Sequence, residues 1–139
     1  MVFRNIIRGL SIVILVIGAP PPPSGTFSTV IAQQPSFLCV QTTWSEDPHE
    51  DVKLGVKCGI AEIESDYLTV EIVVPSVYQL DDASHEDYDF FRNSVDWKCQ
   101  EFPAMQVGDL ATFNYDRTSQ SMMVPFQGAK RNLTAGACF

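Results

Sequence analysis

The feature that most constrains this 139-residue chain is its set of four cysteines, Cys39, Cys58, Cys99 and Cys138. An even number of cysteines in a small extracellular domain favours two disulfides. No two of them form a Cys-x-x-Cys pair, so the spacing predicts no zinc site. We therefore expect a fold that is held together by two covalent bridges and contains no metal or other cofactor.

Four cysteines allow three connectivities, and their spacing alone does not choose among them. We favour the pairs Cys39–Cys138 and Cys58–Cys99. The first pair would close a loop of about 100 residues, which contributes roughly 4–5 kcal/mol in the chain-entropy model. A free reactive thiol is the alternative, because Lys57 and Lys98 precede two of the cysteines and could favour a thiolate.

The N-terminal segment, residues 1–32, predicts a secretory signal peptide and a Pro-rich leader. Arg4 and Arg8 precede an apolar run at 10–17. This run is shorter than the roughly 20 residues that cross a membrane. Cleavage after Ala32 would release a secreted domain at 36–139 that makes no membrane contact. An uncleaved anchor with a Pro-rich spacer is the alternative.

The charge of the chain disfavours two classes of partner. All 17 acidic residues lie at or after Glu46, whereas Arg4 and Arg8 would leave with the leader. A strongly acidic domain is a poor match for the phosphates of nucleic acids or for an anionic membrane surface. Hydrophobic residues make up 45% of the chain, which is enough for a packed core and argues against disorder.

Local patterns predict an α+β fold made mostly of strands. The expected strands are residues 37–44, 67–74, 111–115 and 121–126, followed by a loop at 128–137. One short helix is expected from Ser45–Pro48 to Cys58, and its rival is a loop followed by a strand at 52–63. The acidic stretch 81–89 predicts a turn, and residues 90–99 give no clear prediction.

Three segments occur in a suggestive order. The motif Phe37-Leu38-Cys39 precedes a terminal Cys138, residues 100–105 read QEFPAM, and residues 109–114 read DLATFN. Together they resemble the fungal secreted guanyl-specific ribonucleases, which have the small microbial ribonuclease fold. The resemblance implies one short helix packed on an antiparallel sheet, a bridge between Cys39 and Cys138, and Glu101 in the place of the general base.

The rest of that family's catalytic set is missing. The resemblance places the arginine at Leu110 and the acid histidine at Phe126, and His85 does not align with the second histidine. Loss of one acid or base typically slows such a reaction about 10²–10⁴-fold. Glu101 is therefore expected to be a vestigial base, and the domain is expected to be catalytically inactive.

The chain also resembles the ribonuclease-like effectors that plant-pathogenic fungi secrete. This resemblance implies a monomer that is secreted, enters host cells and binds a host protein or, with less support, RNA. Two alternatives stay open. One is a divergent active ribonuclease that recruits His85, and the other is an extracellular β-rich binding module unrelated to ribonucleases.

Several further residues carry individual expectations. Asn132 begins an Asn-Leu-Thr glycosylation sequon, which we expect in an exposed loop. His85 with His49, and the carboxylates of 81–89, are expected to be solvated rather than to bind a metal ion. The basic pair Lys130-Arg131 could contact phosphate. Five aromatic residues are expected in the core, namely Trp44, Tyr88, Phe90, Phe91 and Trp97.

Overall fold

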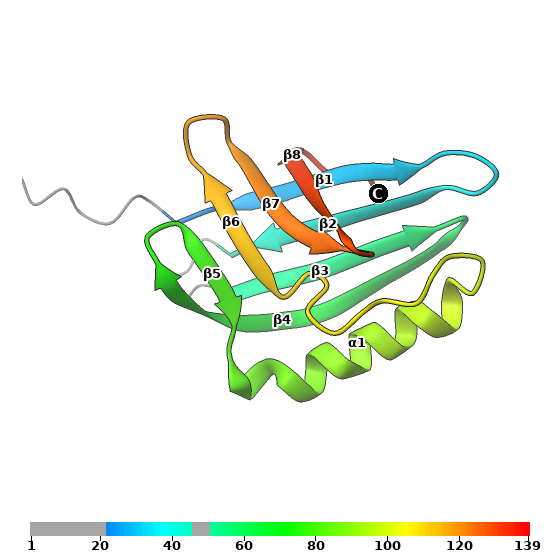
Figure 1. The fold of residues 1–139 in the computed structure, drawn as a ribbon, viewed down its shortest axis with the longest axis horizontal. Coiled ribbons are helices and arrows are strands. Elements are labelled where there is room, and N and C mark those ends of the chain that lie inside the picture. Colours follow the sequence, from blue (N-terminus) through cyan, green and yellow to red (C-terminus); the bar gives the residue numbers. More distant parts are fainter. Residues whose placement is uncertain (1–21, 46–50) are drawn as a thin grey trace, which may run out of the picture.

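The computed structural model describes residues 22–45 and 51–139. These residues form eight antiparallel strands that follow one another in chain order around a closed barrel (Figure 1). The strands are β1 (Gly25–Ala32), β2 (Leu38–Trp44), β3 (Asp51–Cys58), β4 (Ala61–Val74), β5 (Val77–Leu80), β6 (Thr112–Asp116), β7 (Ser121–Phe126) and β8 (Ala129–Ala135). A short 3₁₀ turn, η1 (Asp82–Ser84), and one helix, α1 (His85–Lys98), lie between β5 and β6.

The expected ribonuclease-like architecture is wrong. The sheet is not an open layer with a helix packed on it but closes on itself, and the helix follows β5 rather than preceding Cys58. The expected helix segment after Ser45 is the strand β3, as its rival prediction proposed, and residues 46–50 lie outside the described part. The strand forms because Val52, Leu54 and Val56 alternate inward, which is a period of two.

The remaining predictions for strands and loops have two outcomes. The strands expected at 37–44, 67–74, 111–115 and 121–126 are confirmed as β2, the second half of β4, β6 and β7. The loop expected at 128–137 is wrong, because β8 occupies most of it. Leu133 is the only buried residue of β8, so its sequence lacks the hydrophobic alternation that marks a strand.

Both favoured disulfides are confirmed. Cys39 on β2 is bonded to Cys138 in the C-terminal tail, and Cys58 at the end of β3 is bonded to Cys99 directly after α1. The tail contacts both β2, through Gln41, and β3, through Gly55. A Cβ at Gly55 would lie 2.8 Å from the Phe139 ring, so only glycine permits this close approach.

The strand β1 closes the barrel. It pairs with β2 along most of its length and with β8 at Phe27↔Ala135 and Ser28↔Thr134. Phe27 is buried among the core side chains, and Ser28 Oγ donates a hydrogen bond of 2.7 Å to the Gly136 carbonyl. The leader boundary after Ala32 stays a prediction, and the structure shows that a cut there would remove β1 from the barrel.

Helix α1 covers the part of the barrel core beside β4 that β5 leaves open. The short strand β5 pairs with β6 on one side and with only the second half of β4 on the other. Helix α1 lies beside the remainder of β4 (Figure 1). Three residues of α1 face inward, Tyr88, Phe91 and Val95, and they belong to the same buried cluster as the barrel interior. An eight-stranded barrel is just wide enough for side chains to fill it, so helix and strands share one core.

Side chains on neighbouring elements hold the start of α1 in place. Asp81 Oδ1 accepts a hydrogen bond from the Ser84 amide, and the Thr69 amide of β4 donates one of 2.8 Å to Ser84 Oγ. The first bond caps η1, and the second ties Ser84, the residue directly before α1, to β4. At the other end, the Cys58–Cys99 disulfide ties the last turn to β3, so both ends of α1 are fixed.

None of the described residues belongs to a helix that is both long and apolar enough to cross a membrane.

The role of β1 predicts the effect of a substitution. Phe27→Ala removes a buried ring and is expected to lower the free energy of unfolding by about 3–5 kcal/mol, measured by urea denaturation with the disulfides intact. Val30→Ala is the matched control, because Val30 lies on the same strand but is 43% exposed. It should change the stability by no more than about 0.5 kcal/mol. Equal effects of the two substitutions would contradict the assignment of β1 to the barrel.

Candidate functional site

The most exposed aromatic side chains of the described residues lie on α1. Phe90 is 76% exposed and Trp97 is 75% exposed. They are seven residues apart, which is nearly two full helical turns, so they point the same way about 10 Å apart along the axis. Asn93 lies between them at helical spacing, Glu86 lies one turn before Phe90, and both are exposed. We call this surface, made of Glu86, Phe90, Asn93 and Trp97, the outer α1 face.

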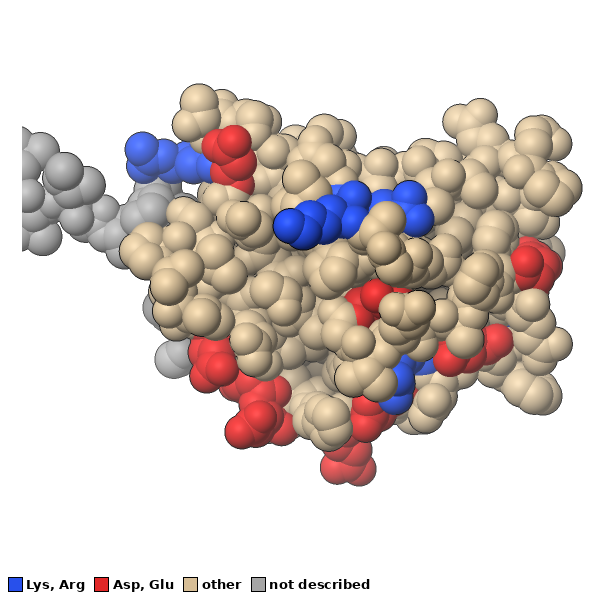
Figure 2. Space-filling model, viewed as in Figure 1, with Lys and Arg blue, Asp and Glu red and all other residues tan. Residues whose placement is uncertain are grey.

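The surroundings of the outer α1 face are acidic. Six acidic and two basic residues lie between Asp81 and Lys98. One of the two basic residues, Arg92, is largely buried and pairs with Asp89 at 3.4 Å, so it adds little positive charge to the surface. In Figure 2 the acidic residues gather along the edge of the molecule that α1 occupies in Figure 1. The outer α1 face therefore combines two large aromatic rings with a negative border.

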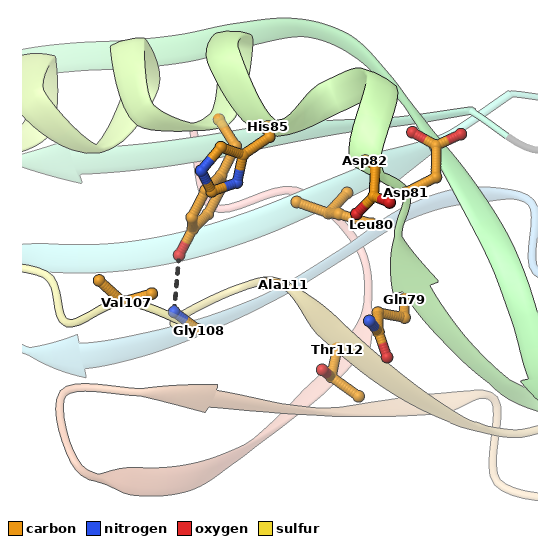
Figure 3. Close-up of a pocket in the computed structure, with 10 residues that line it drawn as sticks. Gln79, Leu80, Asp81, Asp82, His85, Val107, Gly108, Ala111 and Thr112 are labelled. Atoms are coloured by element: carbon orange, nitrogen blue, oxygen red, sulfur yellow. Dashed lines mark hydrogen bonds between the residues drawn. The ribbon is translucent and has the colours of Figure 1, made fainter.

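A small hollow opens beside the start of α1 (Figure 3). Its volume is about 310 Å³, and it lies between the end of β5, the first turn of α1 and the loop that leads into β6. Asp81, Asp82, His85 and Thr112 line it. Both carboxylate oxygens of Asp81 already accept hydrogen bonds within the protein. One accepts from the Ser84 amide, and the other accepts a bond of 2.6 Å from Thr69 Oγ1. This hollow supports the helix start more than it offers free groups to a ligand.

A buried polar network fixes the floor of this hollow. Tyr88 Oη donates a hydrogen bond of 2.7 Å to the Asp109 carbonyl. It also accepts a bond from the Gly108 amide, which is the dashed line in Figure 3. The Asp109 carboxylate accepts bonds from the Gln106 and Gln127 amides. Burial raises the pKa of the Tyr88 phenol above 10.0, so it stays a donor at ordinary pH. Asp109 and Tyr88 are therefore structural groups that join α1 to the β7–β8 turn.

The structure separates the two residues that a divergent ribonuclease would need. His85 opens α1, whereas Glu101 is exposed beyond its C-terminal end. A helix of 14 residues is about 20 Å long, so the two side chains lie too far apart to act on one phosphate. His85 Nε2 instead lies 3.4 Å from Asp89 Oδ2 on the helix surface. His49 lies outside the described residues.

The two positions where the family would place its arginine and acid histidine are core positions. Leu110 and Phe126 are both fully buried. Leu110 also has φ of +55°, a left-handed conformation that few residues other than glycine adopt. Neither position faces a surface from which a substrate could be reached.

The basic pair Lys130-Arg131 does not form a phosphate clamp. Both residues lie on β8, and adjacent residues of a strand point to opposite faces. The Arg131 Nε atom donates a hydrogen bond to the Phe126 carbonyl at the barrel end, whereas Lys130 is exposed on the outer surface. Their charges therefore point to different sides of the sheet.

Of the five aromatic residues expected in the core, three are buried and two are not. Trp44 packs edge-on against Tyr78 and Phe113, and Tyr88 and Phe91 face inward from α1. The prediction was wrong for Phe90 and Trp97. Helical periodicity applied to 85–98 would have separated the two groups, because Tyr88, Phe91 and Val95 recur at the spacing of one helix face.

The remaining sequence predictions are placed as follows. Asn132 is exposed, but it lies on the strand β8 rather than in a loop. The acidic stretch 81–89 is η1 and the start of α1 rather than a turn. Within 22–45 and 51–139, no three His, Cys, Asp or Glu side chains are grouped so that they could hold a metal ion.

Comparison of the chain with protein-family models, curated proteins and solved structures found no match in any of the three. The outer α1 face is therefore judged on its geometry and chemistry alone.

The Tyr88 network generates a prediction about stability. Tyr88→Phe removes one hydroxyl and leaves the buried Asp109 carbonyl and the Gly108 amide unpaired. It should lower the free energy of unfolding by about 1–3 kcal/mol in urea denaturation. Tyr67→Phe is the control, because Tyr67 is 48% exposed and should change little.

The same residue predicts a pH dependence. The folded phenol has a raised pKa, so the contribution of its proton to stability is complete below pH 10.0 and is lost as the pH rises through the folded pKa. The Phe variant lacks this group, so its stability deficit relative to the wild type should shrink at high pH. A deficit that stays constant with pH would contradict the assignment.

Proposed function

We propose that this protein is an extracellular, disulfide-bonded β-barrel module that binds a protein partner through the outer α1 face. The observation that supports this most directly is the pair of exposed rings, Phe90 and Trp97, on one side of a helix that is fixed at both ends. Solvent exposure of two large aromatic rings at helical spacing is unfavourable without a function, and it is typical of helices that enter a partner's groove.

The proposed energetics rest on few residues. Aromatic side chains dominate protein interfaces, and truncation of such an anchor commonly costs 2 kcal/mol or more, which is about 30-fold in Kd. Because α1 is already folded and tied down, little conformational entropy is lost when it binds. The tip of the β4–β5 hairpin also exposes Ile72, Val73 and Val74, but aliphatic side chains of this kind are weaker anchors.

The chemistry of the face defines the partner. The acidic residues around Phe90 and Trp97 favour a partner with an apolar groove bordered by Lys or Arg. Charges of this kind at an interface rim act mainly on the association rate and on the salt dependence of binding. RNA is a less favoured partner, because the segment is acidic and the Lys130 and Arg131 side chains point to opposite sides of β8.

Direct cross-linking tests the proposal. Benzoylphenylalanine in place of Phe90 should form a photoadduct with one discrete partner from a displayed library of extracellular proteins. The same residue in place of Ile72 should not. The partner, once purified, should bind the wild type with an affinity that falls as salt is added.

Substitutions measure the anchor directly. Trp97→Ala is expected to weaken the binding of that partner about 30-fold or more in titration calorimetry, and Phe90→Ala to weaken it as well. Ile72→Ala is the control for loss of an exposed apolar side chain elsewhere. Both α1 variants should keep the wild-type unfolding transition, because the rings are exposed. A partner that binds the wild type, Trp97→Ala and Phe90→Ala equally well would disprove the proposal.

A further inference from the structure

The glycosylation sequon lies on a second surface, the solvent-facing outer side of the barrel strands. Asn132 and Thr134 are both exposed on β8, and the Leu133 side chain between them is buried. The sequon residues therefore share the outer face of the barrel. Asn132 pairs in register with Met123 of β7, which in turn pairs with Asn114 of β6. The outer face thus presents Asn132, Met123 and Asn114 as one row across three strands.

This row forms part of a hollow. A groove of about 780 Å³ on the outer surface is lined by Asn132, Met123, Asn114, Ser121 and Arg117, among others. We call it the Asn132 groove. Asn132 and Asn114 lie two strand spacings apart, about 10 Å. A chain of a few sugar rings that starts at Asn132 can therefore span the groove.

The groove has the mixed chemistry that a sugar chain matches. Asn114 offers an amide, Ser121 a hydroxyl and Arg117 a guanidinium group, and all three can hydrogen-bond to sugar hydroxyls. Met123 is 37% exposed beside Asn132 and offers a flexible apolar surface for the carbon face of a sugar ring. A second, mainly apolar hollow of about 280 Å³ adjoins it across Met123 and Asn114.

We propose that Asn132 carries an N-linked glycan whose first sugars lie in the Asn132 groove and cover Met123. In this modification the Asn132 side-chain nitrogen forms a bond to the anomeric carbon of the first sugar. That carbon's bond to the pyrophosphate of a lipid-linked oligosaccharide donor breaks, and the amide nitrogen loses one proton. The modification requires passage through a eukaryotic secretory pathway, and the predicted signal peptide is consistent with secretion.

This glycan would also restrict where a protein partner can bind. A glycan seated in the Asn132 groove covers Met123 and the outer surface of β6 and β7 beside it, so that surface becomes unavailable to other proteins. The outer α1 face carries no sequon and stays open. The glycan proposal rests on different residues from the binding proposal, so either one can fail without the other.

The rate of methionine oxidation tests whether the glycan covers Met123. The full chain is secreted from a eukaryotic host as the wild type, as Asn132→Gln and as Thr134→Ser, which keeps a sequon. Each folded protein is treated with hydrogen peroxide, and oxidation at each methionine is followed by peptide mass spectrometry. Met105 and Met122 are buried and serve as internal controls.

The expected result is a glycan mass on the wild type and on Thr134→Ser, with Met123 oxidised several-fold more slowly than in Asn132→Gln. Enzymatic removal of the glycan from the folded wild type should restore rapid oxidation of Met123 and leave Met105 and Met122 unchanged. This second measurement does not depend on the folding of any variant. Absence of the glycan mass, or a glycan that leaves the oxidation rate of Met123 unchanged, would overturn the proposal.

Discussion

The structure depends on the seam where its first and last strands meet. β1 and β8 share only two register pairs, whereas β1 pairs with β2 along most of its length. The Cys39–Cys138 disulfide reinforces this seam by fastening the tail after β8 to β2, on the far side of β1. The Cys138 amide also donates a hydrogen bond of 3.1 Å to Gln41 Oε1. Closure of the barrel thus rests on a short run of backbone pairs and one covalent bridge that spans it.

The sequence predicted those parts of the fold whose pattern is local and strong. β2, the second half of β4, and the β6–β7 hairpin have β-branched and aromatic residues with turn signals beside them. The favoured cysteine pairing is also confirmed, although the cysteine spacing alone left three connectivities open. β8 was missed because only Leu133 marks its inner face. β1 was assigned to the leader, because an apolar segment after a signal sequence gives no local sign that it pairs with β2 and β8.

The candidate site was harder to predict because it depends on which residues a helix turns outward. Tyr88, Phe91 and Val95 face the core while Phe90 and Trp97 face solvent. These two groups separate only once 85–98 is treated as a helix, and the sequence pattern of 90–99 predicted no particular structure. The short ribonuclease-like motifs misled for a related reason. Asp109 is a buried acceptor for two loop amides, and Leu110 is a core residue, so a matched string of residues serves a different purpose in this fold.

The Cys58–Cys99 disulfide, at the exit of α1, links the shape of the outer α1 face to the redox state of its surroundings. In an oxidising compartment the bond holds the last helical turn against β3, so Trp97 is presented in a fixed place. Reduction would release that turn, and the helix would then have to be ordered again as it binds, which costs conformational entropy. For the binding proposed above, the Cys58–Cys99 bond would therefore favour recognition under oxidising conditions and weaken it under reducing ones.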